Sequence, residues 1–122
     1  MKAMYKEKDG KTVSILGTDY KIVFVPDNDK RLVSRNADAI TDESVKELVI
    51  AYFEPDYGSL KDLDAYQKKL IRHEIVHAFL FESGLAECSG YVNGWAQNEE
   101  MVDWIARQHI KMHDAFAKAG AL

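Results

Sequence analysis

The sequence has 122 residues, 47% of them hydrophobic, with 16 basic and 20 acidic side chains and a formal net charge of −4. This length and composition predict one globular domain, residues 1–122, and the acidic balance argues against nucleic-acid binding. No apolar run approaches the roughly 20 residues of a membrane span, no signal-peptide pattern is present, and a single cysteine excludes an internal disulfide. We therefore expect a cytoplasmic protein that binds no membrane. The composition gives no indication of oligomeric state.

The first expected elements are β-strands. Residues 11–26, KTVSILGTDYKIVFVP, alternate apolar and polar positions around a Gly-Thr-Asp turn, which predicts a β-hairpin. Residues 31–44 show only a weak pattern, and their TDES sequence indicates a turn. Residues 45–53, VKELVIAYF, are compatible with helical spacing, but their strand-forming residues and the PDYGS that follows favour a strand.

Two long helices are expected in the second half of the chain. Residues 63–80 repeat apolar positions at helical spacing, with Ser59 or Asp62 as the capping residue and Gly84 at the end. After a loop, a second helix begins near Asn98, a favoured N-cap residue followed by two acids. The element order predicts an α+β fold in which a small, mostly antiparallel sheet of about three strands packs against two long helices.

The first predicted helix carries His73, Glu74 and His77 in the spacing H-E-x-x-H. Residues four apart share one helix face, so His73 and His77 can direct two imidazole nitrogens at one ion. Zinc accepts such ligands, and Glu74, turned by about 100° from His73, can take a proton from a metal-bound water. The alternative is an amphipathic helix with two incidental histidines, but the apolar flanks of the motif would give a metal site the rigid support it needs.

Two histidines leave such a site incomplete, because catalytic zinc normally has three protein ligands. Glu99 and Asp103 lie four apart on the second predicted helix. Glu99 can therefore bind the metal while Asp103 accepts the free N–H of a ligating histidine. Glu100 is turned away and suits a solvated acid of the first turn, but it stays open as an alternative ligand. Cys88 is a further candidate, although a lone cysteine is more often a small buried residue.

Other polar and aromatic residues could be mistaken for site residues. His109 and His113 are also four apart, but they lie about 15 Å or more beyond Glu99 along the helix and cannot bind the same metal. We expect them near the apolar helix face in structural roles, and Trp104 in the core. Tyr91, in the loop between the helices, is a candidate hydrogen-bond donor to a developing oxyanion.

Taken together, HEIVH at 73–77 and NEEMVD at 98–103 resemble the gluzincin signature of thermolysin-like metallopeptidases. In that family the downstream Glu is the third zinc ligand and the Asp orients a ligating histidine. The run EEMVDWIA at 99–106 is also similar to the E-x-x-A-[DN]-x-F-A run of ImmA/IrrE-type intracellular peptidases of phages and mobile elements. Val102 and Ile105 replace the Ala and Phe of that pattern, and both changes are between apolar residues.

The resemblance implies a zincin-like fold and a minimal zinc metallopeptidase of the phage or prophage type, acting on a peptide or protein substrate. Zn²⁺ would be bound by His73, His77 and Glu99, with Glu74 as general base and then acid, and Asp103 as the support of a histidine.

In zincins an edge strand beside the active-site helix binds the substrate in extended form. The segment ELVIAY, residues 47–52, is the candidate for this role. Two other functions stay open, a non-catalytic zinc-stabilised protein-interaction module and a hydrolase of non-peptide amides.

Overall fold

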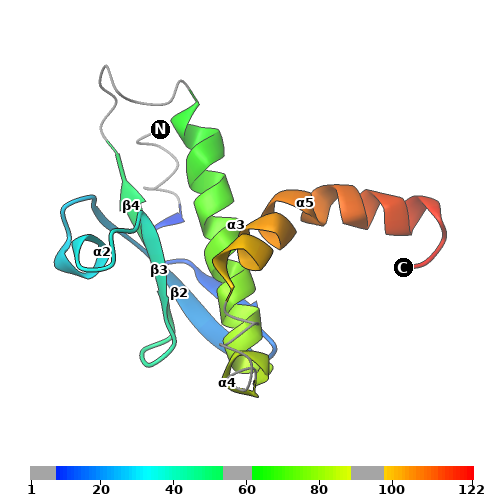
Figure 1. The fold of residues 1–122 in the computed structure, drawn as a ribbon, viewed down its shortest axis with the longest axis horizontal. Coiled ribbons are helices and arrows are strands. Elements are labelled where there is room, and N and C mark those ends of the chain that lie inside the picture. Colours follow the sequence, from blue (N-terminus) through cyan, green and yellow to red (C-terminus); the bar gives the residue numbers. More distant parts are fainter. Residues whose placement is uncertain (1–7, 54–61, 89–97) are drawn as a thin grey trace.

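The structure is a computed structural model that describes residues 8–53, 62–88 and 98–122. Figure 1 shows a small sheet with one long helix packed along it and a second long helix that crosses the first. In chain order the elements are β1 (Thr12–Ile15), β2 (Thr18–Pro26), α2 (Lys30–Val33), β3 (Ala39–Asp42), β4 (Glu47–Tyr52), α3 (Leu63–Glu82), α4 (Leu85–Cys88) and α5 (Glu99–Lys118). The expected α+β class is confirmed.

The sheet has four strands in the order β1-β2-β4-β3. The pairs β1–β2 and β3–β4 are antiparallel, whereas β2 and β4 run parallel, with Ile22 opposite Leu48. The expectation of about three mostly antiparallel strands is therefore wrong in the strand count and in the central pairing. Because α2 and β3 lie between β2 and β4 in the chain, they form the long connection that a parallel pair requires.

Strand β3 lies within the weakly patterned residues 31–44 and was not expected. Ala39, Ile40 and Thr41 are all buried, because the strand is covered on both faces. Ala39 packs in the cluster under α3, and Ile40 packs in a second cluster on the opposite face. A strand buried on both faces lacks the alternation that identifies a strand in a sequence.

The segment ELVIAY forms strand β4, as expected. It lies between β2 and β3, and residues 48–51 have no exposed surface. The expectation that it provides a substrate-binding edge is therefore wrong, because both of its edges are paired with neighbouring strands. Among the described residues, the edge strands are β1 and β3.

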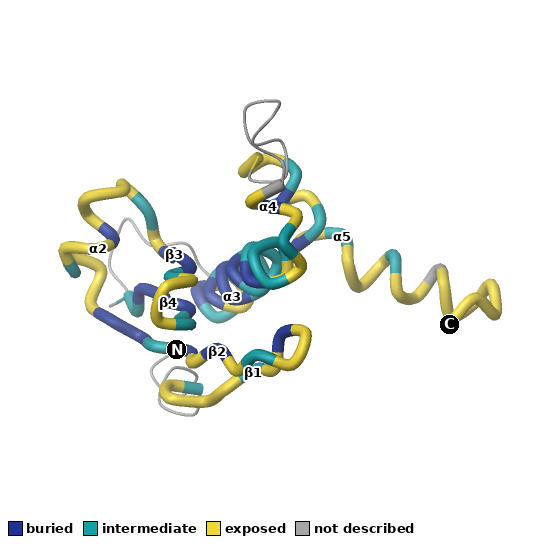
Figure 2. Tube along the Cα trace, turned by 90° about the horizontal axis from the view of Figure 1, so that it is seen from below, coloured by how far each residue is buried: buried dark blue, intermediate teal, exposed yellow. Residues whose placement is uncertain are grey.

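The core consists of two apolar clusters, one on each face of the sheet. Figure 2 shows buried residues concentrated on the strands and on α3. The cluster between the sheet and α3 contains Ile15, Tyr20, Ile22, Phe24, Ala39, Leu48, Ile50, Leu70, Ile71 and Ala78. The cluster on the other face contains Val25, Leu32, Ile40, Val49 and Ala51, and Leu32 comes from α2. Both faces of the sheet are thus covered, and α3 is fixed along one of them.

Helix α3 begins at a side-chain cap and ends close to a glycine. The Asp62 side chain accepts a hydrogen bond from the backbone N–H of Ala65 at 2.9 Å, which confirms Asp62 as the N-cap. Ser59, the other candidate, lies outside the described residues. Gly84 follows the helix with a φ of 82°, the left-handed conformation that ends helices and favours glycine. Short helix α4 follows where only a loop was expected.

The last turn of α3 is joined to the sheet by Glu82. Its carboxylate accepts a hydrogen bond from the hydroxyl of buried Tyr20 at 2.7 Å and pairs with Lys46 at 2.8 Å. Burial and the hydrogen bond to Glu82 raise the pKa of Tyr20, so this hydroxyl stays protonated and remains a donor. These contacts hold the far end of α3 on β2 and on the turn before β4.

Helix α5 packs on α3 through its first turns. Val102 and Ala106 are fully buried, and Arg72 on α3 donates a hydrogen bond to the backbone oxygen of Ala106 at 3.1 Å. Small side chains at this position let the two helices approach closely. None of the helices in the described residues has the length and apolar character needed to cross a membrane.

The outer part of α5 extends away from the rest of the chain (Figures 1 and 2). His109 and His113 are exposed, and Trp104 is 56% exposed. The expected core position of Trp104 is therefore wrong, and the two histidines lie on a part of the helix that is open to solvent. Among the described side chains of α5, only Val102 and Ala106 are buried, whereas apolar Ile110 and Phe116 farther along the helix are exposed.

Replacing Leu48 by Ala tests the position of β4 at the centre of the sheet. Leu48 has no exposed surface, so the cavity should lower the free energy of unfolding by about 3 kcal/mol. Val45 is 58% exposed, so Val45→Ala should change it by less than about 0.5 kcal/mol. Urea unfolding followed by circular dichroism measures both, and equal losses would contradict a central β4.

Candidate metal centre

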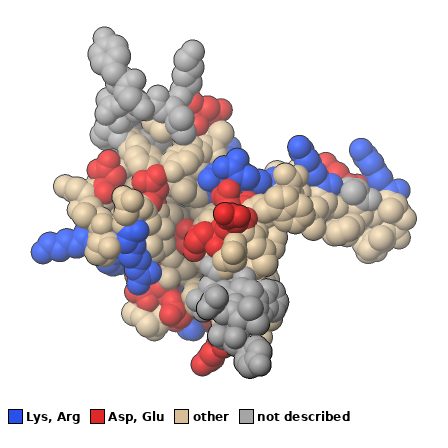
Figure 3. Space-filling model, in the orientation of Figure 1, with Lys and Arg blue, Asp and Glu red and all other residues tan. Residues whose placement is uncertain are grey.

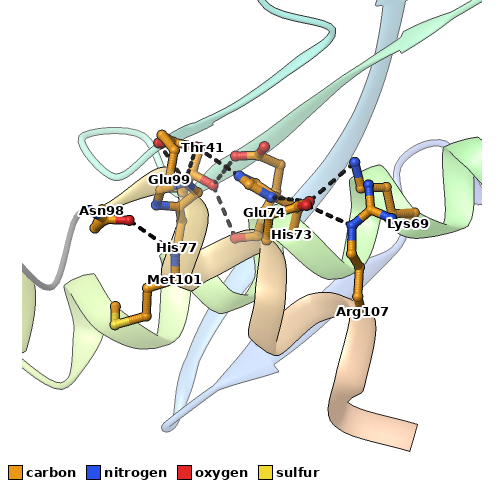
Figure 4. A network of polar contacts seen from close by, with 10 residues as sticks. Thr41, Lys69, His73, Glu74, His77, Asn98, Glu99, Met101 and Arg107 are labelled. Atoms are coloured by element: carbon orange, nitrogen blue, oxygen red, sulfur yellow. Dashed lines mark hydrogen bonds and ion pairs between the residues drawn. The ribbon is translucent and has the colours of Figure 1, made fainter.

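Helix α5 begins with a capping arrangement that orients its first turn. The Asn98 side chain accepts a hydrogen bond from the backbone N–H of Met101 at 3.0 Å, and its backbone oxygen accepts one from Val102 at 3.0 Å. Asn98 is thus the N-cap, as expected. Since buried Val102 faces α3, Glu99 at the start of the same helix is brought to the middle of α3 (Figure 4).

Glu99 contacts both histidines of the H-E-x-x-H motif. Its Oε2 lies 2.9 Å from His73 Nε2, and its Oε1 lies 3.1 Å from His77 Nε2. One ligand atom from each residue lies within 4.8 Å of the others, so this group could hold a metal ion. Ligands of a tetrahedral zinc with bonds of about 2.0 Å are about 3.3 Å apart, which fits these separations. Two imidazoles and one carboxylate are also a ligand set that zinc accepts.

Asp103 contacts the other nitrogen of His73. Its Oδ1 lies 3.3 Å from His73 Nδ1 and 3.1 Å from the Lys69 ammonium, and its Oδ2 lies 2.6 Å from Arg107 Nε. Partial burial opposes ionisation, but hydrogen bonds from Arg107, Lys69 and His73 outweigh it and lower the pKa of Asp103 to about 2. An ionised carboxylate can only accept, so Asp103 is placed to take a hydrogen bond from the Nδ1–H of His73. In that tautomer Nε2 would present its lone pair to a metal lying between His73 and Glu99.

Glu74 is buried beside this cluster, with only 4% of its surface exposed. Its Oε1 accepts a hydrogen bond from the Thr41 hydroxyl at 2.8 Å. Burial raises the pKa of Glu74, although the bond from Thr41 and the nearby histidines act in the opposite direction. A carboxylate with a raised pKa is a stronger base, which suits the role expected for Glu74.

Thr41 is the site residue that the sequence did not indicate. It reaches Glu74 from β3, a strand whose existence was not expected. The register of β3 against β4, in which Thr41 lies opposite Leu48, places its hydroxyl here. No motif spacing relates Thr41 to the helix, since the two residues are 33 positions apart.

The remaining candidate site residues either lie away from the group of His73, His77 and Glu99 or lie outside the described part of the chain. Glu100 is exposed and does not belong to the metal-binding group of the described residues, which supports Glu99 as the ligand. His109 and His113 are also outside this group, as expected. The side chain of Cys88 and all of Tyr91 lie outside the part of the chain that the structure describes, so the expectations for them stay predictions.

A cleft of about 560 Å³ opens beside the cluster. One wall is residues 35–41, which include β3 and the turn before it, and the other wall is formed by α3 and α5. His73, Glu74, His77 and Glu99 all line it. Figure 3 shows acidic and basic side chains close together on this face, where α5 meets α3. The cluster is therefore open to a ligand from one side.

The chain matches no protein-family model, no curated protein and no solved structure. The two motifs and the geometry of the cluster are therefore the observations that bear on its function.

The ligand assignment predicts different metal contents for two neighbouring variants. Glu99→Ala removes the carboxylate that contacts both histidines, so the protein should lose most of its zinc. Glu100→Ala is the matched control and should bind as much zinc as the wild type, for which we expect about one ion per chain. Elemental mass spectrometry after dialysis against buffered zinc measures both. Loss of zinc in Glu100→Ala alone would overturn the assignment.

The depressed pKa of Asp103 predicts a pH-dependent stability. Its pKa falls from 3.8 to about 2 in the folded chain, so the carboxylate contributes stability above pH 3.8 that is lost as the pH falls towards 2. In the presence of a chelator, the wild type should unfold at higher urea concentration than Asp103→Asn at pH 7. This gap should narrow between about pH 4 and pH 2. A gap that does not depend on pH would contradict the role of the charge.

Proposed function

We propose that the chain is a zinc-dependent peptidase of the gluzincin type with a zincin-like fold. The observation that carries this proposal is the convergence of His73, His77 and Glu99 from two helices beside a buried carboxylate, Glu74. The arrangement satisfies the donor set and spacing of a catalytic zinc site with three protein ligands. A cytoplasmic location and an origin in a phage or mobile element, both implied by the motif resemblance, belong to the same proposal.

Each residue then has a distinct chemical role. Zn²⁺ held at this position would lower the pKa of a bound water to about 7 and polarise the substrate carbonyl. Glu74 takes the proton of the attacking water at its carboxylate and delivers it to the departing amine nitrogen. Asp103 keeps the His73 proton on Nδ1, so that the Nε2 lone pair is available.

Within the part of the chain that the structure describes, no strand pairs with the outer edge of β3, and this edge provides a site for an extended peptide. The backbone N–H of Ala51 donates to the oxygen of Asp38 at 2.9 Å, which fixes the alternation of the antiparallel ladder. Ile40 therefore directs its backbone groups at β4, while those of Ala39 and Thr41 point to the open edge along the cleft. A substrate strand can pair with these groups and lie beside Glu74. In this proposal β3, and not β4, is the edge strand that binds the substrate.

The second candidate is a non-catalytic, zinc-stabilised module that binds another protein. Exposed apolar side chains on the outer part of α5, among them Ile110 and Phe116, favour it. The cleft and the buried carboxylate of Glu74 favour the peptidase, because a purely structural zinc site requires neither. A hydrolase of non-peptide amides would use the same groups, and substrate profiling distinguishes it.

Glu74→Gln tests catalysis separately from metal binding. The variant should retain stoichiometric zinc, because Glu74 is not in the ligand group, but it should lose hydrolysis by at least about 100-fold. Cleavage of a peptide library followed by mass spectrometry measures the activity. Glu87→Gln, an exposed acid on α4, is the control and should keep both properties. Full activity in Glu74→Gln would rule out the mechanism.

A further inference from the structure

The Thr41 hydroxyl oxygen contacts two atoms of Glu74, the candidate general base. This oxygen, Oγ1, lies 2.8 Å from Glu74 Oε1 and 3.0 Å from the backbone oxygen of Glu74 (Figure 4). Thr41 is itself 7% exposed, so the contact lies at the buried junction of β3 and α3. The single proton of this hydroxyl lies within reach of both oxygens, and the carboxylate oxygen is the nearer acceptor.

The hydroxyl of Thr41 is the hydrogen-bond donor that the Glu74 carboxylate has in the described part of the chain. A buried carboxylate without a donor is destabilised by the full desolvation free energy, and its side chain can then turn to other rotamers. The bond from Thr41 removes part of this cost in one orientation only. That orientation keeps the Glu74 carboxylate on the cleft wall beside His73 and His77.

The main chain of Thr41 belongs to the open edge of β3. The ladder alternation directs its N–H and C=O away from β4 and along the cleft, where the proposed substrate strand pairs. The side chain of Thr41 instead points towards α3, where its hydroxyl contacts Glu74. Through one hydrogen bond, Thr41 therefore connects the strand that would hold a substrate directly to the carboxylate that would act on it.

We propose that Thr41 is a positioning residue that holds the Glu74 carboxylate in its working orientation and ties it to the edge strand on which the substrate lies. The proposal rests on the peptidase function proposed above. It assigns no contact between the Thr41 hydroxyl and the substrate or the metal. A β-branched residue with a hydroxyl suits the position, because the branch favours a strand and the hydroxyl supplies the donor.

Two substitutions separate the hydroxyl from the shape of the side chain. Thr41→Val keeps the branched shape and removes the donor, whereas Thr41→Ser keeps the donor and removes a methyl group. Thr41→Ala, which also lacks the donor, takes the place of Thr41→Val if that variant does not fold. Thr12→Val, at an exposed position of strand β1, is the control for a Thr-to-Val change in the sheet.

Steady-state kinetics on a peptide cleaved by the wild type give the first test. Thr41→Val should lower kcat at least about tenfold and leave KM within about twofold, because the hydrogen bond orients the base and not the substrate. Thr41→Ser should restore kcat to within about threefold of the wild type. Zinc content should stay equal in all variants, and Thr12→Val should be unchanged. A wild-type kcat in Thr41→Val, or a loss in Thr41→Ser as large as in Thr41→Val, would overturn the proposal.

A second test does not require activity, so failure of the peptidase and failure of this proposal are distinguishable. A wild type that cleaves no peptide would refute the peptidase function. In that case crystal structures of the three proteins decide the role of Thr41. The Glu74 carboxylate should move in Thr41→Val and keep its wild-type position in Thr41→Ser. An unmoved carboxylate in Thr41→Val would overturn the proposal.

Discussion

The contact between α3 and α5 is the constraint on which the rest of the site depends. The two histidines occupy one turn of α3, and the third member of the cluster reaches them only because α5 crosses at that turn. The crossing is close since Val102 and Ala106 are buried there, and the bond from Arg72 to the Ala106 backbone fixes it. A shift of one helical turn, about 5.4 Å, would remove Glu99 from both imidazoles. The packing of Val102 and Ala106 thus determines whether Glu99 meets the two histidines.

The sheet contributes through a different set of constraints. Helix α3 is fixed on it by the apolar cluster below and by Glu82 at its end. Strand β3 then brings Thr41 against the same turn that carries Glu74. Two elements therefore meet the H-E-x-x-H turn of α3. Helix α5 brings a candidate metal ligand to it, and strand β3 brings a hydrogen-bond donor to the buried carboxylate of Glu74.

The parts of the site that follow local rules could be predicted from the sequence. The spacing of His73 and His77 determines that they share a helix face, and the cap at Asn98 together with the interval from Glu99 to Asp103 determines the face of the second helix. These are interactions over one or two turns. The α+β class also follows from the order of the elements.

The remaining features depend on contacts that are distant in sequence. The parallel pairing of β2 with β4 and the edge position of β3 depend on which strands lie side by side in the folded chain. Residues 39–42 carry no apolar-polar alternation because β3 is buried on both faces. Thr41 could not be identified without that register. The periodicity of α5 defines an apolar face, but it does not define how much of that face α3 covers, which is why Trp104 is exposed.

Helix α5 is attached to the body only near its beginning, and this has a thermodynamic consequence for any ion in the cluster. A metal held by His73, His77 and Glu99 would cross-link the two helices at the crossing itself. An ion that binds the folded arrangement and not the separated helices stabilises it by an amount that grows with its free concentration. The free energy that holds α5 on α3 would then depend both on the chain and on the free metal concentration around it.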